Sequence, residues 1–278
     1  TLPAGLNFGT NNGTIWGTAT ELWTTTNYTV YGNNTGGSFN VSLNITVNDE
    51  LPTLSYLPEN LTLTRGQSSS YLPLAPTLSG PGDITSWSIN TTLPNGLFLG
   101  PNNGTLYGIA TVNMTMTAYT IYASNSGGSA SAQINITILE PIVTLDYNPE
   151  NLTLVRSDAM TTLHPTVTGG NAEIWGIHPS IPAGLNFADG VLSGTPTVNL
   201  TRTTFTIYAN TTGGSATHTI NITIQEPIVT LDYNPENFTL VRSIPMTTLH
   251  PTVTGGNVET WGIHPSIPAG LNFADGVL

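Results

Sequence analysis

Few side chains in this chain could carry out chemistry. Its 278 residues include five histidines and four arginines, but no lysine and no cysteine. The absence of cysteine excludes a disulfide framework, a zinc-thiolate site and a cysteine nucleophile. The sequence also lacks a GxSxG nucleophile elbow, an HExxH zinc motif and a glycine-rich phosphate loop. We therefore predict that the chain is not an enzyme and that it uses no cofactor.

The histidines mostly recur in pairs at copied positions. His164 is repeated as His250, and His178 is repeated as His264. Residues that are copied along with a repeat are more simply structural. We therefore favour a structural role over a metal site that would join His164 to His178.

Asparagine offers a different chemistry, because the triplet Asn-x-Ser/Thr accepts N-linked glycans. Fifteen triplets occur, about twice the number expected by chance from the Asn, Ser and Thr content. Copying of repeats explains part of this excess, and threonine-rich strands could produce some triplets incidentally. We predict N-glycosylation at Asn12, Asn27, Asn33, Asn40, Asn44, Asn60, Asn90, Asn103, Asn113, Asn135, Asn151, Asn199, Asn210, Asn221 and Asn237.

The strands that would carry these asparagines have a clear polarity. In residues 39–47, FNVSLNITV, apolar side chains alternate with polar ones, which is the pattern of a half-buried strand. Asn40 and Asn44 therefore face solvent, and the same alternation in residues 216–224 exposes Asn221. A glycan on such a face does not disturb the core, so the pattern predicts an extracellular surface.

A phrase that occurs four times divides the chain into repeats. The sequence reads LPAGLNF, LPNGLFL, IPAGLNF and IPAGLNF around Pro3, Pro94, Pro182 and Pro268. This spacing of about 88 residues suits a small domain with its own core. The predicted divisions are a C-terminal half repeat at 1–48, complete repeats at 49–138 and 139–225, and an N-terminal half repeat at 226–278.

Each complete repeat contains seven or so short strands separated by turn residues, and no helical pattern is visible. This arrangement predicts an all-β chain of tandem immunoglobulin-like or cadherin-like antiparallel β-sandwiches. In the repeated phrase, Pro182 and Gly184 should turn the chain, and Leu185 and Phe187 should return it to the core. A tryptophan precedes each phrase, and we expect it to be buried, although it could instead stack on a sugar: Trp87, Trp175 and Trp261.

The strings LPAGLNFGTNNGTIWGTAT and IPAGLNFADGVLSGTPT resemble the "putative Ig" repeats of large prokaryotic surface proteins. That family is a cadherin-like relative of immunoglobulin domains, and its last hairpin carries the sequence GGS, as in YANTTGGS here. The second repeat departs from the pattern with GIATV in place of GTPT. The resemblance implies the sandwich fold and a role as spacer, stalk or adhesive module.

The resemblance also raises calcium, because similar cadherin-like domains bind it at their linkers through clustered carboxylates. Here the clustered acidic motif is missing. One linker has Asp49 and Glu50, and the others have only Glu140 or Glu226, with Asp146 and Glu150 near the first of these. Calcium is therefore an alternative to the prediction that no metal binds.

Charge limits the possible partners. A net charge of −12 without a basic patch would repel a phosphate backbone, so no nucleic-acid partner is predicted. No window of 18 residues is apolar throughout, so no membrane span is predicted. Two copied pairs at fixed spacing, Glu150 with Arg156 and Glu236 with Arg242, could form ion pairs on the surface.

Nearly the same sequence motif occurs at both ends of the chain, as LPAGLNF and IPAGLNF. Residues 140–192 and 226–278 differ at only five positions, and neither end looks like a capping repeat. We expect a segment of a longer periodic chain, or copies that join end to end. In both cases residues 226–278 of one copy should pack with residues 1–48 of the next along a filament axis.

Three classes of function fit these features. An N-glycosylated extracellular filament or stalk, made of copies of itself on an archaeal cell surface, explains the copying, the triplets and the missing catalytic motifs together. An adhesin or glycan-binding surface protein would use the repeats as a spacer beneath a tip domain. A non-catalytic module of a secreted enzyme would need a catalytic domain elsewhere in its chain. We favour the first class.

Overall fold

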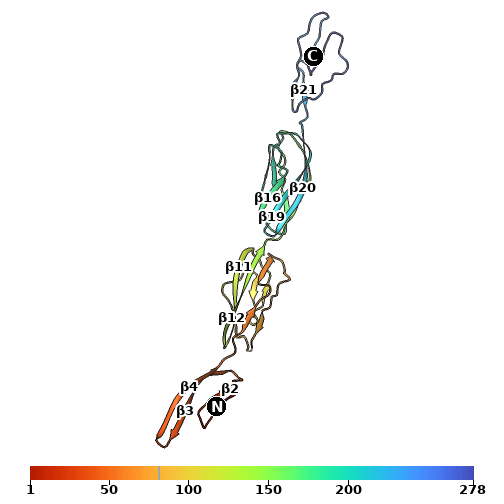
Figure 1. The fold of residues 1–278 in the computed structure, drawn as a ribbon. Helices are drawn as coiled ribbons and strands as arrows, with labels where there is room; N and C mark the ends of the chain where they lie inside the picture. The colour runs from red at the N-terminus through yellow and green to blue at the C-terminus, as the bar shows by residue number, and fades with distance from the viewer. Residues whose placement is uncertain (81) are drawn as a thin grey trace. The chain divides into compact units, whose positions relative to one another are not determined.

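The computed structural model describes residues 1–80 and 82–278, and this part of the chain contains strands, turns and loops but no helix (Figure 1). Residue contacts divide the chain into two compact units, Thr1–Glu140 and Pro141–Leu278. Each unit holds one complete sandwich and one half repeat.

The complete sandwich of the first unit lies between residues 53 and 139. Strands β6, β12, β11 and β8 form a four-stranded sheet in that order, while β5 pairs with β7 and β9 with β10. These pairs are antiparallel except β6–β12, which is parallel. The bounds are β5 (Thr53–Ser55), β6 (Asn60–Thr64), β7 (Thr77–Ser79), β8 (Ser86–Ile89), β9 (Leu97–Leu99), β10 (Leu106–Gly108), β11 (Met114–Asn125) and β12 (Gly128–Leu139).

The second unit repeats this topology between residues 144 and 225. Strands β14, β20, β19 and β16 form the four-stranded sheet, with β14–β20 again parallel, and β13 pairs with β15 and β17 with β18. The predicted all-β sandwich is thus confirmed, except that one strand pair in each sandwich is parallel, which the sequence did not predict. The bounds are β13 (Thr144–Tyr147), β14 (Asn151–Val155), β15 (Pro165–Thr168), β16 (Ile174–His178), β17 (Leu185–Ala188), β18 (Val191–Gly194), β19 (Leu200–Thr211) and β20 (Gly214–Gln225).

The core of each sandwich is built by alternation along its last strand. On β20, Ile220, Ile222 and Ile224 are buried, while the residues between them are partly exposed. Ile134, Ile136 and Ile138 on β12 are buried in the same way. The alternation that the sequence predicts is therefore present in both sandwiches, and it turns the intervening asparagines outward.

The repeated phrase forms a tight corner, as expected. The amide of Leu185 donates a hydrogen bond to the carbonyl of Pro182 at 3.1 Å, and Leu185 then enters the core. Gly184 has a φ of +89°, and a Cβ at this position would lie 2.0 Å from the carbonyl oxygen of Thr195. Only glycine fits this corner, which explains why the phrase always contains it.

The tryptophan before each corner is only half-buried, whereas the sequence predicted that it would be buried. Trp175 packs against the core of its sandwich, and its ring also lies over Gly190. A Cβ atom added to Gly190 would lie only 2.7 Å from this ring. The hydroxyl of Tyr147 donates to the carbonyl of the same Gly190 at 2.5 Å. Burial raises the pKa of this phenol. The same trio recurs as Tyr56, Gly104 and Trp87, and as Tyr233, Gly276 and Trp261.

In the two half repeats the strands form only two-stranded sheets. Residues 1–48 form β1 (Leu6–Phe8) with β2 (Ile15–Gly17) and β3 (Trp23–Asn34) with β4 (Gly37–Val47). Residues 226–278 form β21 (Thr230–Asp232) with β22 (Thr252–Thr254). Side chains at core positions are exposed in both halves: Leu43 is 39% exposed and Leu240 is 42% exposed. Their counterparts in the first sandwich, Ile134 and Leu63, are buried.

Candidate functional site

The fifteen predicted glycan acceptors all lie at the surface in the described structure. Twelve are exposed, and the other three, Asn135, Asn210 and Asn221, are half-exposed on the long strands. No acceptor lies in a core. The surface is therefore sterically open to N-linked glycans at the places the sequence indicates, and this openness is the geometric condition that the chemistry requires.

Several acceptors lie next to each other in pairs that the sequence does not reveal. Asn60 and Asn135 are register partners on β6 and β12, and their side-chain amides are joined by a hydrogen bond of 2.8 Å. Asn151 and Asn221 are paired in the same way on β14 and β20, at 3.0 Å. Adjacent strands lie about 4.8 Å apart, so two bulky glycans on one pair would crowd each other.

Other acceptors are tied into local structure. The side-chain oxygens of Asn12 and Asn103 accept hydrogen bonds from backbone amides two residues further on, at 3.2 and 3.1 Å. These are Asx turns, and both residues are exposed. Asn199 differs, because its amide nitrogen donates to the carboxylate of Glu226.

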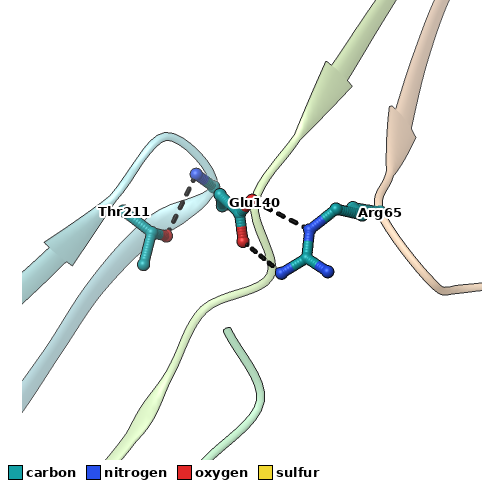
Figure 2. A network of polar contacts seen from close by, with 4 residues as sticks. Arg65, Glu140 and Thr211 are labelled. Atoms are coloured by element: carbon teal, nitrogen blue, oxygen red, sulfur yellow. Dashed lines mark hydrogen bonds and ion pairs between the residues drawn. The ribbon is translucent and has the colours of Figure 1, made fainter. Parts of the chain in front are cut away.

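The carboxylate that follows the last strand of each complete sandwich is held by an arginine of that sandwich. Figure 2 shows the first example, in which Arg65 donates two hydrogen bonds to Glu140, at 2.8 and 2.7 Å. In the second repeat, Arg156 donates to Glu226 at 2.5 Å. This contact, followed by the contact from Asn199, lowers the pKa of the Glu226 carboxyl, and the pKa of the Arg156 guanidinium is raised.

The predicted pairing of Glu150 with Arg156 is therefore wrong. Glu150 precedes β14 and Arg156 follows it, so the two side chains lie at opposite ends of one strand. Because β14 runs parallel to β20, the end of β14 lies beside the end of β20, where Glu226 follows. The parallel pairing, which the sequence pattern does not reveal, selects the partner.

The linker residues weighed for calcium do not gather at one point. Glu140 and Glu226 face arginines. Asp49 instead accepts a hydrogen bond of 2.8 Å from the hydroxyl of Ser126, in the hairpin tip of its own repeat. The linker acids thus serve as anchors between the linker and the body of a repeat.

Three potential metal ligands do come together in the second sandwich. Asp146, Glu150 and His218 place one ligand atom each within 4.8 Å of one another, the single such group of three in the described part of the chain. His164 and His178, the pair weighed from the sequence, are exposed and do not belong to it. The sequence did carry a signal for His218, because it is the one histidine that is not repeated.

The comparisons with known proteins concern the family and the fold. The model of the family described as "Putative Ig domain" matches residues 51–139 and 143–225. A search of curated protein sequences gives no match. No helix in the described residues is long and apolar enough to cross a membrane.

Several solved structures of multidomain fragments have a chain path similar to this one. The I-band fragment I67–I69 from titin is 14% identical with a TM-score of 0.43, and the match covers 79% of this chain and 81% of that one. The N-terminal four Ig domains of Dscam1 isoform 9.44 are 14% identical with a TM-score of 0.40, covering 65% and 47%. Extracellular domains 3–5 of Drosophila OTK are 15% identical with a TM-score of 0.36, covering 80% and 78%.

Proposed function

The chain belongs to the "Putative Ig domain" family, and we propose that it is a structural segment of an N-glycosylated extracellular filament or stalk. The proposed repeat divisions are 1–48, 49–138, 139–225 and 226–278. The repeats act as rigid spacers and carry no catalytic role. This proposal goes beyond the family, whose fold serves several functions.

The observation that carries the proposal is the position of the glycosylation triplets on the sandwich. Asn135 and Asn221 occupy the same place on β12 and β20, and Asn60 and Asn151 the same place on β6 and β14. Each complete repeat therefore presents the same pair of acceptors on its outer sheet surface. Few charged side chains cover this surface, since only 7% of the residues are charged. Glycans would supply the solubility that charge does not.

Glycopeptide mass spectrometry of the protein purified from its native surface tests this proposal. We expect N-linked glycans at the three outward strand positions Asn44, Asn135 and Asn221 and at the equivalent set Asn60, Asn151 and Asn237, with at most one member of each hydrogen-bonded pair modified on a given molecule. Unmodified peptides at all six positions would refute the glycosylated surface and leave the sandwich fold untouched.

We also propose that copies of the chain associate through their half repeats. A hollow of about 1020 Å³ lies between the hairpins of residues 1–48, and polar residues share its lining with apolar side chains that include Phe8, Ile15, Val30 and Phe39. An uncovered apolar sheet face is a surface for association. Residues 226–278 carry the strands that complete a sandwich in the full repeats, so this segment of a second copy is the partner that covers the open face.

Sedimentation velocity over a range of concentrations tests this association. We expect Leu43→Asn, on the open core face, to shift the protein toward smaller species. Ile174→Thr is the matched control, because Ile174 is 64% exposed on a complete sandwich and Thr260 already stands at its copied position. A wild-type protein that stays monomeric at every concentration would overturn the proposal, as would equal effects of the two substitutions.

A further inference from the structure

His218 occupies a position where the sandwich calls for an apolar side chain. It lies on β20 with the same orientation as Ile220, Ile222 and Ile224, which face the core. The corresponding residue of β12, counted from the glycine that opens each strand, is Ala132. An imidazole on the inward side of a strand has little access to water, so its nitrogens need partners within the protein.

The surroundings fix the ring of His218 but leave one nitrogen without a hydrogen bond. The imidazole packs against the buried ring of Tyr147, with 5.7 Å between ring centroids, and its side chain is only 14% exposed. Its Nε2 atom is buried and has no hydrogen-bond partner. A buried polar atom of this kind is rare and points to a group that it could bind.

Two carboxylates stand at the rim beside this ring. The Oδ1 atom of Asp146 lies 4.0 Å from Nδ1, and the Oε1 atom of Glu150 lies 3.7 Å from Nε2. Both distances are longer than a hydrogen bond. The carboxylate side chains are 65% and 61% exposed, so they can rotate while the imidazole stays in place.

We propose that Asp146, Glu150 and His218 bind a divalent transition-metal ion, with Zn²⁺ as the best match. One imidazole nitrogen and two carboxylate oxygens are a ligand set that Zn²⁺ accepts, with water at the remaining position. Calcium prefers oxygen ligands alone, so this set does not suit it. Zinc bonds of about 2.0–2.2 Å require ligand atoms about 3.4 Å apart. The atoms now lie within 4.8 Å, and rotation of the exposed carboxylates closes the difference.

The chain contains its own comparison for this site. In the first sandwich the corresponding positions hold Ser55, Glu59 and Ala132, so one carboxylate remains and the other two ligands are missing. The two sandwiches have the same topology. The site therefore depends on two substitutions between copies, and it is independent of the proposed glycosylation.

Isothermal titration of the whole chain with ZnCl₂, in a buffer free of chelators, tests the proposal. We expect one Zn²⁺ per chain bound through these ligands, no response to CaCl₂, and affinity reduced at least tenfold by Asp146→Asn and by Glu150→Gln. His218→Ala should abolish this binding event. Because alanine is the natural residue at this place in the first sandwich, the variant should fold, and circular dichroism checks that it does.

Glu59→Gln and His178→Ala are the matched controls. The first removes the single corresponding ligand of the other sandwich, and the second removes an exposed histidine of the same sandwich; both should bind Zn²⁺ like the wild type. Cobalt gives a second readout, since Co²⁺ bound at the site should show visible absorption that His218→Ala removes. No binding at millimolar Zn²⁺, or binding that His218→Ala leaves unchanged, would overturn the proposal.

Discussion

Gly190 offers the sharpest test of how the repeated sequence stabilises the sandwich. Its φ is +80°, a conformation that costs an L-residue about 1–2 kcal/mol. A Cβ added here would lie 2.7 Å from the Cζ3 atom of Trp175, which cannot move away without leaving the core. Overpacking of this kind costs about 1–3 kcal/mol. The lower entropy of the unfolded alanine chain offsets part of this. We expect Gly190→Ala to destabilise the second sandwich by about 2–4 kcal/mol.

Hydrogen exchange in increasing denaturant, read by mass spectrometry, measures this loss in one sandwich at a time. Peptides from β19 and β20 should exchange at lower denaturant concentration in the variant. Peptides from β11 and β12 belong to the other unit and serve as an internal reference.

Gly176 supplies the matched control in the same sandwich. A Cβ at this position on β16 meets only the Cδ2 atom of Tyr208, at an ordinary 3.8 Å. Gly176→Ala should therefore leave the stability unchanged or raise it slightly, because glycine weakens a strand. If Gly190→Ala exchanged like the wild type, or no worse than Gly176→Ala, the tight contact between glycine and tryptophan would not stabilise the fold as we argue.

Three further outcomes follow from the same structure. Trp175→Ala should lower the free energy of unfolding of the second sandwich by about 2–4 kcal/mol, as measured by denaturant unfolding. This is somewhat less than for a fully buried aromatic residue, because Trp175 is half-buried. Glu226→Gln should lower the urea midpoint of unfolding most at neutral pH, where the wild-type carboxylate is ionised and bound to Arg156. Because Arg156 lowers the pKa of Glu226 in the folded state, the difference in midpoint should shrink as the pH falls below the ordinary carboxyl pKa of about 4.5 and through the lower pKa of the folded state. A difference that persists at the lowest pH would contradict this assignment. Mass spectrometry of an intact fragment that spans both Asn60 and Asn135 should show at most one glycan on this pair per molecule, because the two side chains share a hydrogen bond on adjacent strands.

The sequence predicts the parts of this fold that depend on local periodicity. The alternation around Asn135 and Asn221 places both on the outside and their isoleucine neighbours inside, as the structure has them. The corner at Gly184 is equally predictable, because a close approach to Thr195 admits only glycine. In each case the physical cause lies in a neighbouring stretch of the same repeat.

What the sequence could not predict depends on which strands become neighbours. Arg156 has Glu150 nearby in the sequence, yet it binds Glu226, 70 residues away, because β14 and β20 run parallel. Trp175 was expected in the interior, but it covers Gly190 at the edge of the core.

Copying and divergence of the repeats act on different parts of the sandwich. The trio of Tyr147, Gly190 and Trp175 recurs in each copy that contains these positions, because its members fit one another and none can change alone. The position of His218 is freer, since Ala132 occupies its counterpart without altering the topology. An imidazole there has Glu150 beside it and gains a second carboxylate neighbour because β13 supplies Asp146, where the first sandwich has Ser55. A repeat can therefore acquire a binding site through two substitutions at the end of its core while the contacts that stabilise it stay unchanged.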